Sequence, residues 1–411
     1  MVGEAGIDLL NLLLVLVVAW IGGLVVERVG YPALLGELLA GVIFGPPLLG
    51  LLHPSEVLEI LAELGVFLLM LYVGMEVDLH DLFELGPKAV MVALGGFVVP
   101  FGLGYLIGVL LEFSIEAALF MGIALAATSL ATKSRILVDL DILDTRIAGV
   151  LLGGALLSDV GVLVVFTGVM SYIETGTVTV SGVGWVATKA IGFFAIALVV
   201  GDRVLPLVWT VLEDWMDRHH FVDKTSAFTV ALVVALVFAF LAALVELHMI
   251  IGGFVAGLFL RQAQLDPDIY DHIYNVIYDL AMGFFAPIFF VTVAFELTLS
   301  VFVDRLGLLL IVLVAAFVGK IAGSWLFALV TGLTSKEGLV IGLGMNGRGT
   351  VEIVIVSIAL GADIIDVELF SVLVFMAIFT TVLVPPTVKW GVGWLDRADE
   401  LVLMEQPSTG E

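Results

Sequence analysis

The sequence contains no cysteine, so disulfide bonds and thiol-based redox control are excluded. It is also poor in basic residues, because 16 Lys and Arg stand against 40 Asp and Glu, which gives a formal net charge of −24. Such an acidic chain repels polyanions, so a nucleic-acid partner is excluded. Acidic residues crowd nearly every predicted connection, and two explanations stay open: simple solubility of the loops, or a halophilic host.

Long polar segments are missing as well. Hydrophobic residues make up 61% of the 411 positions, a share far above that of a soluble globular domain. Apolar runs of about 20 residues recur along the chain, long enough to cross a hydrocarbon layer ~30 Å thick as helices. The alternation of apolar and polar residues that marks a membrane β-barrel is absent from the sequence. An all-α polytopic membrane protein is therefore predicted.

Counting the apolar runs predicts about 13 transmembrane helices. They cover residues 9–26, 32–51, 57–75, 88–111, 116–138, 146–171, 185–209, 224–245, 248–260, 275–295, 306–330, 338–360 and 369–390. The connections are too short for a sizeable soluble domain, so we expect one membrane domain over residues 1–395 and a short polar cytoplasmic tail over residues 396–411. The first run lacks a basic region and a small-residue cleavage site, which predicts a retained span.

The positions of Lys and Arg predict the orientation, because basic residues favour the cytoplasmic side. With the N-terminus outside, the outer connections keep only Lys189 and Arg305. The cytoplasmic side then holds Arg28, Lys88, Lys133, Arg135, Arg146, Arg203, Arg218, Lys224, Arg261, Lys336, Lys389 and Arg397. The prediction is an N-terminus outside and a C-terminus inside, in the plasma membrane of a prokaryote.

The fifth predicted span contains a small, hydroxyl-rich interruption, Ala127-Thr128-Ser129-Leu130-Ala131-Thr132. A broken helix leaves backbone groups free, which a membrane tolerates only where they are buried in protein or face water. A tightly packed interface of small residues is the alternative explanation. The next span carries a lone carboxylate, Asp159, preceded by Ser158. An acid near the bilayer centre costs about 2.5–3.5 kcal/mol, so Asp159 is interpreted as functional.

A second interruption lies in the twelfth predicted span, at Gly344-Met345-Asn346-Gly347-Arg348-Gly349-Thr350, and Glu352 follows it. The two broken spans lie in corresponding positions, one in each half of the chain. This arrangement is typical of secondary transporters built from inverted repeats, whose site lies where two discontinuous helices cross. Close packing alone would not place Arg348 at the second interruption.

Four ionisable side chains are predicted near the bilayer centre, namely Asp159, Lys320, Arg348 and Glu352, and their formal charges balance. Arg348 and Glu352 are four residues apart on one helical face and can pair directly. We interpret this pair, with Asn346, mainly as structural and charge compensation at the second interruption, with direct transport as the alternative. Asp159 and Lys320 can titrate, since burial and pairing oppose each other at both groups.

A carboxylate that binds either a proton or a small cation, but never both, exchanges one for the other. The hydroxyl groups that could complete an oxygen shell for Na+ or K+ are those of Thr128, Ser129, Thr132 and Ser158. The sequence thus predicts alternating-access antiport in which Asp159 binds the proton and the transported metal ion in turn, with no resident cofactor.

Several segments of the chain resemble those of the cation:proton antiporter-2 family, which has the sodium/hydrogen exchanger fold. They are YPALLGELLAGVIFGPPLLG, LAELGVFLLMLYVGMEVDL, HMIIGGFVAGLFL, FFAPIFFVTVAFEL and MNGRGTVEIVIVSIAL. The resemblance covers residues 9–390 and implies a core around spans 4–6 and 11–13, a separate dimerisation region from the remaining spans, and a homodimer. It also implies that Asp159 is the essential ion- and proton-binding acid and that Lys320 faces it as its charge partner.

Ser158 departs from the family pattern, because electrogenic members commonly carry a second Asp there and other members an Asn or Gln. A Ser removes one titratable charge, which favours electroneutral exchange and leaves Na+ and K+ open as substrates. The regulatory nucleotide-binding domain of potassium-efflux members is missing from the sequence, so gating of that kind is not expected.

Two functions are the alternatives to antiport of Na+ or K+. A sodium-coupled symporter of organic anions shares this fold, but Lys320 opposite the acid argues against it. A channel is disfavoured because no re-entrant selectivity filter is visible. The sequence contains no nucleophile–base pair and no metal cluster, so we expect a transporter and not an enzyme.

Overall fold

The computed structural model describes residues 8–77, 86–140, 142, 145–175, 224–244, 249–262, 267–397 and 402. Within these ranges the chain forms helices joined by turns and contains no strand, which confirms the predicted all-α class. The predicted span 185–209 and the basic residues Lys189, Arg203 and Arg218 lie outside the described residues. So does the predicted tail, apart from Val402 and the end of the last helix.

Eight of the described helices are long and apolar enough to cross a membrane, by the criteria of length and composition. Four shorter apolar helices accompany them, over Ala33–Phe44, Ile115–Ala126, Met249–Arg261 and Thr350–Gly361. Each predicted span other than 185–209 coincides with one of these helices or with two consecutive helix segments. The prediction of a polytopic helical membrane protein is confirmed.

The chain divides into two compact units, the first of which comprises Met1–Glu27, Ala33–His80 and Leu163–Glu296. Its helices are α1 (Leu9–Glu27), α2 (Ala33–Phe44), α3 (Glu56–Glu76), α11 (Lys224–Leu244), α12 (Met249–Gln262), α13 (Pro267–Leu280), the π-helix η1 (Ala281–Phe285) and α14 (Ala286–Phe295). Helix α12 packs against α3, and there a Cβ atom added at Gly74 would lie 2.0 Å from the Phe254 carbonyl oxygen. Small residues therefore set the helix spacing, as expected where burial of apolar surface provides no driving force.

Prolines explain two features of the first unit. Helix α2 ends at Phe44, directly before Gly45-Pro46-Pro47. Just before Pro287, α13 passes through the π-helical turn η1 into α14. Proline lacks the N–H that an α-helix needs at this point, so regular α-helical hydrogen bonding is interrupted here.

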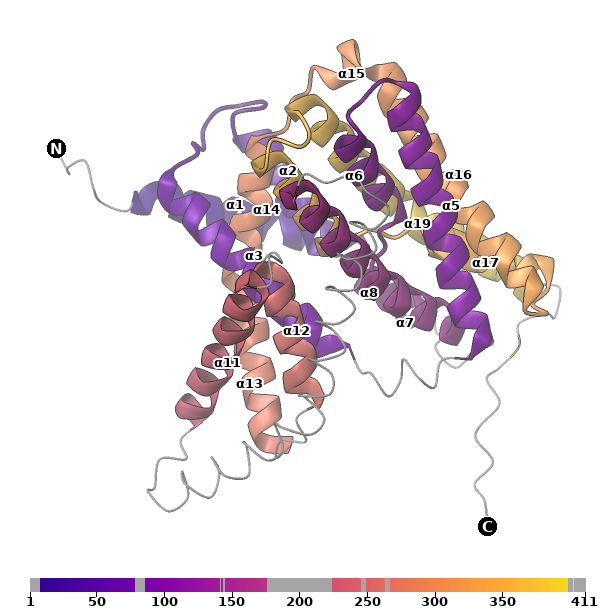
Figure 1. Ribbon diagram of the computed structural model, residues 1–411, viewed down its shortest axis with the longest axis horizontal. Coiled ribbons are helices and arrows are strands. Elements are labelled where there is room, and N and C mark those ends of the chain that lie inside the picture. The colour runs from indigo at the N-terminus through magenta and orange to yellow at the C-terminus, as the bar shows by residue number, and fades with distance from the viewer. Residues whose placement is uncertain are drawn as a thin grey trace. The chain divides into compact units, whose positions relative to one another are not determined.

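The second unit comprises Arg28–Pro32, Asp81–Val162 and Leu297–Glu411. Its helices are α5 (Pro87–Leu110), α6 (Ile115–Ala126), α7 (Leu130–Asp139), α8 (Arg146–Thr175) as far as Val162, α15 (Val301–Asp304), α16 (Leu306–Val330), α17 (Ser335–Gly344), α18 (Thr350–Gly361) and α19 (Val367–Asp396). The order of one full span, one interrupted span and one full span occurs twice, in α5–α8 and in α16–α19 (Figure 1). Four predicted spans, an even number, lie between the two copies of three spans each, so we expect the copies to cross the bilayer in opposite directions.

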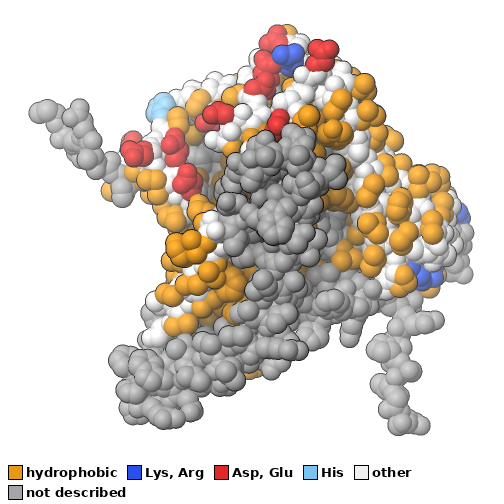
Figure 2. Space-filling model, viewed as in Figure 1, with side chains coloured by type: hydrophobic (Ala, Val, Ile, Leu, Met, Phe, Trp, Pro, Cys, Tyr) orange, Lys and Arg blue, Asp and Glu red, His pale blue; other side chains and the backbone are white. Residues whose placement is uncertain are grey.

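Helices α5 and α16, the first helices of the two copies, pack side by side (Figure 1). Their backbones are in close contact at Gly95 and Gly323. A Cβ atom added at Gly95 would lie 2.2 Å from the Gly323 carbonyl oxygen, and one added at Gly323 would lie 2.1 Å from the Gly95 carbonyl oxygen. Both helices carry exposed apolar side chains, including Leu94, Val98, Leu310 and Val314. Figure 2 shows hydrophobic side chains, in orange, gathered over this side of the second unit. Such a surface suits contact with lipid.

We predict that Gly323→Ala lowers the stability of the protein by about 1–3 kcal/mol, the usual cost of overpacking. The added methyl group meets backbone, which cannot turn aside as a side chain can, so α5 and α16 must separate. Gly102→Ala on α5 is the matched control, because an added Cβ atom there meets nothing within 4 Å. Thermal unfolding in detergent checks this, and equal melting temperatures for the two variants would contradict it.

Candidate ion-binding site

The first interruption separates α6 from α7. Ser114 caps the start of α6 by accepting a hydrogen bond of 3.1 Å from the Ala117 N–H, and the helix ends at Ala126. Residues Ala127, Thr128 and Ser129 are not helical, and α7 resumes at Leu130. The last carbonyl groups of α6 therefore lack the amide partners that a continuous helix would give them.

The second interruption separates α17 from α18. Thr334 and Glu337 form a capping box at the start of α17, which ends at Gly344, and α18 begins at Thr350. The Thr128 hydroxyl lies 2.9 Å from the Met345 carbonyl oxygen and 3.1 Å from that of Gly347. The two interruptions therefore contact each other within the second unit, and the predicted crossing of two discontinuous helices is confirmed.

Arg348 connects the second interruption to the end of α6. Its side chain is 1% exposed and donates hydrogen bonds to the carbonyl oxygens of Ala124, Leu125 (3.0 Å) and Ala127 (3.2 Å). It also pairs with Glu352 at 3.4 Å, as the four-residue spacing predicts. The carboxyl end of a helix attracts a cation, so Arg348 both satisfies the free carbonyl groups and neutralises the end of α6.

Lys320, on α16, supports the same helix end. Its side chain is completely buried, and its ammonium group donates to the carbonyl oxygens of Ala126 and Ala127, the latter at 3.2 Å. Arg348 and Lys133 repel the ammonium group of Lys320, and its favourable Coulombic interactions are with Glu352 and, more weakly, Asp159. The hydrogen bonds that position this lysine therefore come from the backbone of the first interruption, whereas the family resemblance implies a lysine that faces the acid.

Asp159 and Ser158 lie side by side in sequence on α8, and both are buried, with 8% and 2% of their surface exposed. Among the described residues, the Ser158 hydroxyl and the Asn346 side-chain carbonyl oxygen have no hydrogen-bond partner. Buried oxygen atoms without a partner are rare in folded proteins, so such atoms beside a proposed ion site are candidate ligands. The end of α8 that leads to Asp159 is fixed by Arg146, whose Nε lies 3.0 Å from a Glu337 carboxylate oxygen.

The predicted position of Lys133, in a cytoplasmic connection, is wrong. The structure buries it completely on α7, where its ammonium group donates to the Thr128 hydroxyl and to the carbonyl oxygens of Ser129 (2.7 Å) and Gly347 (3.5 Å). Its main favourable Coulombic interaction is with Asp159. A signal was present, since Lys133 lies inside the predicted span 116–138, but the interruption that turns it inward is a tertiary feature.

A sequence model described as "Sodium/hydrogen exchanger, transmembrane" matches residues 13–394. The chain belongs to this family. It is 31% identical over 372 residues to the Na+/H+–K+ antiporter GerN of Bacillus cereus, covering 90% of this chain and 92% of that relative. It is 29% identical to the high-affinity Na+/H+ antiporter NhaS3 of Synechocystis, over 93% of this chain and 89% of that one.

The fold of this exchanger-family chain is similar to a solved structure, that of the sodium proton antiporter MjNhaP1 from Methanocaldococcus jannaschii. The TM-score is 0.68 at 18% sequence identity, over 94% of this chain and 96% of the other. This likeness establishes the sodium/proton antiporter fold.

The predicted site residues of the exchanger fall into three groups. Contacts across the two interruptions bring together Thr128, Ser129, Lys320, Arg348 and Glu352, with Asn346 in the second interruption. Ser158 and Asp159 lie on α8, linked to this group by Coulombic interactions of Asp159 with two lysines. The side chain of Thr132 lies outside the described residues. The described residues contain no group of three or more His, Asp and Glu that could hold a metal ion.

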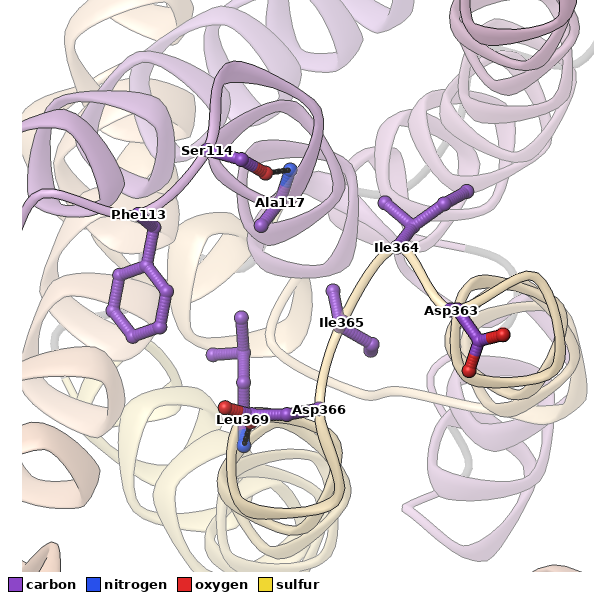
Figure 3. Close-up of a pocket in the computed structure, with 8 residues that line it drawn as sticks. All are labelled: Phe113, Ser114, Ala117, Asp363, Ile364, Ile365, Asp366 and Leu369. Atoms are coloured by element: carbon purple, nitrogen blue, oxygen red, sulfur yellow. Dashed lines mark hydrogen bonds between the residues drawn. The ribbon is translucent and has the colours of Figure 1, made fainter.

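A pocket of about 340 Å³ lies elsewhere in the second unit, between the start of α6 and the turn from α18 to α19 (Figure 3). It is lined by Phe113, Ser114, Ala117, Asp363, Ile364, Ile365, Asp366 and Leu369. Ser114 and Asp366 cap the helices that begin there, since each accepts a hydrogen bond from a main-chain N–H (Figure 3). None of the predicted site residues lines this pocket. Of its two acids, Asp366 caps α19 and Asp363 is exposed.

Proposed function

We propose that the chain is a secondary active antiporter that exchanges a monovalent cation, Na+ in preference to K+, for a proton by alternating access. The observation that carries this proposal is a buried carboxylate, Asp159, in the same unit as two helix interruptions that contact each other. The family and the printed names of the relatives support the same function. They favour it over symport of an organic anion.

Exchange at Asp159 requires that one carboxylate holds either cargo. In its ionised form Asp159 binds the cation, and oxygen atoms from Thr128, Ser129, Ser158 and Thr132, together with carbonyl groups of the interruptions, complete the shell. When the cation leaves, a proton binds to Asp159 in its place. The next change of access therefore carries a proton across the membrane in the opposite direction to the cation. Lys320 and Arg348 hold the broken backbone in place throughout, because they already satisfy the carbonyl groups at the end of α6.

The charges at the site support one-for-one, electroneutral exchange. Ser158 precedes the acid where a second carboxylate would add a charge, and Glu352 is paired with Arg348. A single carboxylate that swaps one proton for one monovalent cation moves no net charge across the membrane.

The two units are proposed to have different functions. We assign ion binding to the second unit, which contains both interruptions, and dimerisation to the first, so that the working form is a homodimer. The chain would lie in the plasma membrane of a prokaryote with the N-terminus outside and the C-terminus in the cytoplasm. It would act as a transporter without enzymatic activity or a resident cofactor, and the acidic composition would suit a halophilic host.

Dissipation of a pH gradient in proteoliposomes tests this function, with Na+, K+ and Li+ supplied separately and empty vesicles as control. We expect Na+ to dissipate the gradient most strongly, and clamping the membrane potential to leave the rate unchanged. Dependence on the clamp would contradict electroneutral exchange. Failure with every cation, together with uptake of an organic anion, would favour the symporter instead.

A further inference from the structure

Lys133 lies where the two helix interruptions meet. Two of the oxygen atoms that accept its hydrogen bonds, the Thr128 hydroxyl and the Ser129 carbonyl, come from the first interruption. The third, the Gly347 carbonyl, comes from the second. An ammonium group has three donors, so these three atoms, which we call the oxygen cage, satisfy it fully.

The oxygen cage has the composition of a monovalent cation site. Carbonyl and hydroxyl oxygens are the ligands that replace the water shell of Na+ or K+ inside membrane proteins. The Thr128 hydroxyl also lies 2.9 Å from the Met345 carbonyl oxygen, which is outside the cage, so its proton can point there while a lone pair faces Lys133. A cation in the cage and the ammonium group of Lys133 would therefore use the same atoms.

The charges around the cage reinforce this competition. With Lys133 included, three cationic side chains stand against the two carboxylates of Asp159 and Glu352, and all five are buried. Lys133 interacts favourably with Asp159 and unfavourably with Arg348. A further cation that enters this cluster is repelled for as long as the ammonium group of Lys133 stays in the cage.

We propose that Lys133 is a specificity-determining residue of the exchanger, which fills the oxygen cage with its own ammonium group and competes there with the transported cation. The inference rests on the proposed cation:proton exchange and deepens it. In this structure the ammonium group of Lys133 occupies the cage. The cation-bound state therefore requires that this side chain moves away from Gly347 and Thr128. Lys133 thereby weakens cation binding and restricts transport to ions that can displace an ammonium group.

The test compares Lys133→Met, which keeps the length of the side chain and removes its charge, with Lys133→Arg, which keeps the charge. In proteoliposomes, Lys133→Met should lower the Na+ concentration for half-maximal exchange by about tenfold or more, equivalent to about 1.4 kcal/mol. The maximal rate should change less than this concentration does. For Lys133→Arg, the Na+ concentration for half-maximal exchange should be equal to or higher than that of the unmodified protein.

Lys389→Met is the matched control, because Lys389 is exposed on α19 and the substitution changes the charge equally. It should leave the Na+ dependence unchanged. An unchanged or higher half-maximal Na+ concentration for Lys133→Met overturns the proposal. Stabilisation against heat by Na+ in detergent gives a second readout that needs only folded protein, and Lys133→Gln replaces Lys133→Met if the latter does not fold.

The outcomes also separate this inference from the function on which it rests. If the unmodified protein shows no cation-driven proton movement, the proposed exchange fails. If it exchanges Na+ for protons and both neutral variants keep the same Na+ dependence in transport and in thermal stabilisation, only the competition by Lys133 is overturned.

Discussion

Replacing Asp159 by Asn should reduce Na+-driven proton exchange to the level of vesicles without protein. The amide has nearly the same shape as the carboxylic acid, but it neither carries a negative charge for the cation nor takes up the exchanged proton. Asp159 is buried beside Ser158 and interacts with Lys133 and Lys320. The other carboxylate of the described site, that of Glu352, cannot replace it because it is paired with Arg348. The measurement is the decay of an imposed pH gradient after addition of Na+.

Asp363→Asn provides the matched control for this experiment. Asp363 is exposed in the turn after α18, where its φ of 54° is one that Asn tolerates well. Transport by the control should equal that of the unmodified protein, and both variants should elute as folded, monodisperse protein. Retention of Na+-driven proton exchange in Asp159→Asn would show that another group binds the proton and the cation.

Replacing Arg348 by Met should cost about 3–5 kcal/mol of stability, the loss expected when one partner of a buried charge pair is removed. The carbonyl groups of Ala124 and Leu125 would lose the guanidinium donor, that of Ala127 would keep only Lys320, and the Glu352 carboxylate would remain buried without its cation. We expect little folded protein or a strongly lowered melting temperature in detergent. Arg348→Lys should recover only part of this loss, because a single ammonium group cannot span three carbonyl oxygens as the guanidinium does.

Arg305→Met is the control for the loss of a charged side chain. Arg305 is paired with Glu368 at 2.6 Å, but both side chains are well exposed, and exposed ion pairs contribute little to stability. Its melting temperature should stay close to that of the unmodified protein. If Arg348→Met melts as Arg305→Met does, Arg348 does not hold the two interruptions together.

The positions of the helices could be predicted closely from the sequence. Helix α16 begins and ends at the predicted residues, and α8 and α19 begin within a few residues of prediction. The reason is that the bilayer acts on each segment separately: every span must be long, apolar and internally hydrogen-bonded, whatever its neighbours are. The same rule exposed the two interruptions, because Ala, Thr, Gly and Asn there break an otherwise uniform apolar composition.

The ion pair of Arg348 and Glu352 was predictable for a related reason, since residues four apart share one face of a helix. The main contacts of Arg348 were not predictable. They reach Ala124, Leu125 and Ala127, more than 200 positions away in sequence. The same holds for Lys320, whose hydrogen bonds go to the backbone of the first interruption.

The sequence by itself determined that this protein spans a membrane with helices and that two of the spans are broken, and it predicted Asp159 as the acid of the transport site. Those conclusions depend on local composition, which a hydrocarbon solvent constrains residue by residue. Only the tertiary structure decided what satisfies the broken backbone: Arg348 and Lys320 on the carbonyl groups of α6, and Lys133 in the oxygen cage. From its position in the sequence, Lys133 cannot be distinguished from a lysine at the membrane surface. It is buried because the fold brings carbonyl groups from distant parts of the chain to its ammonium group.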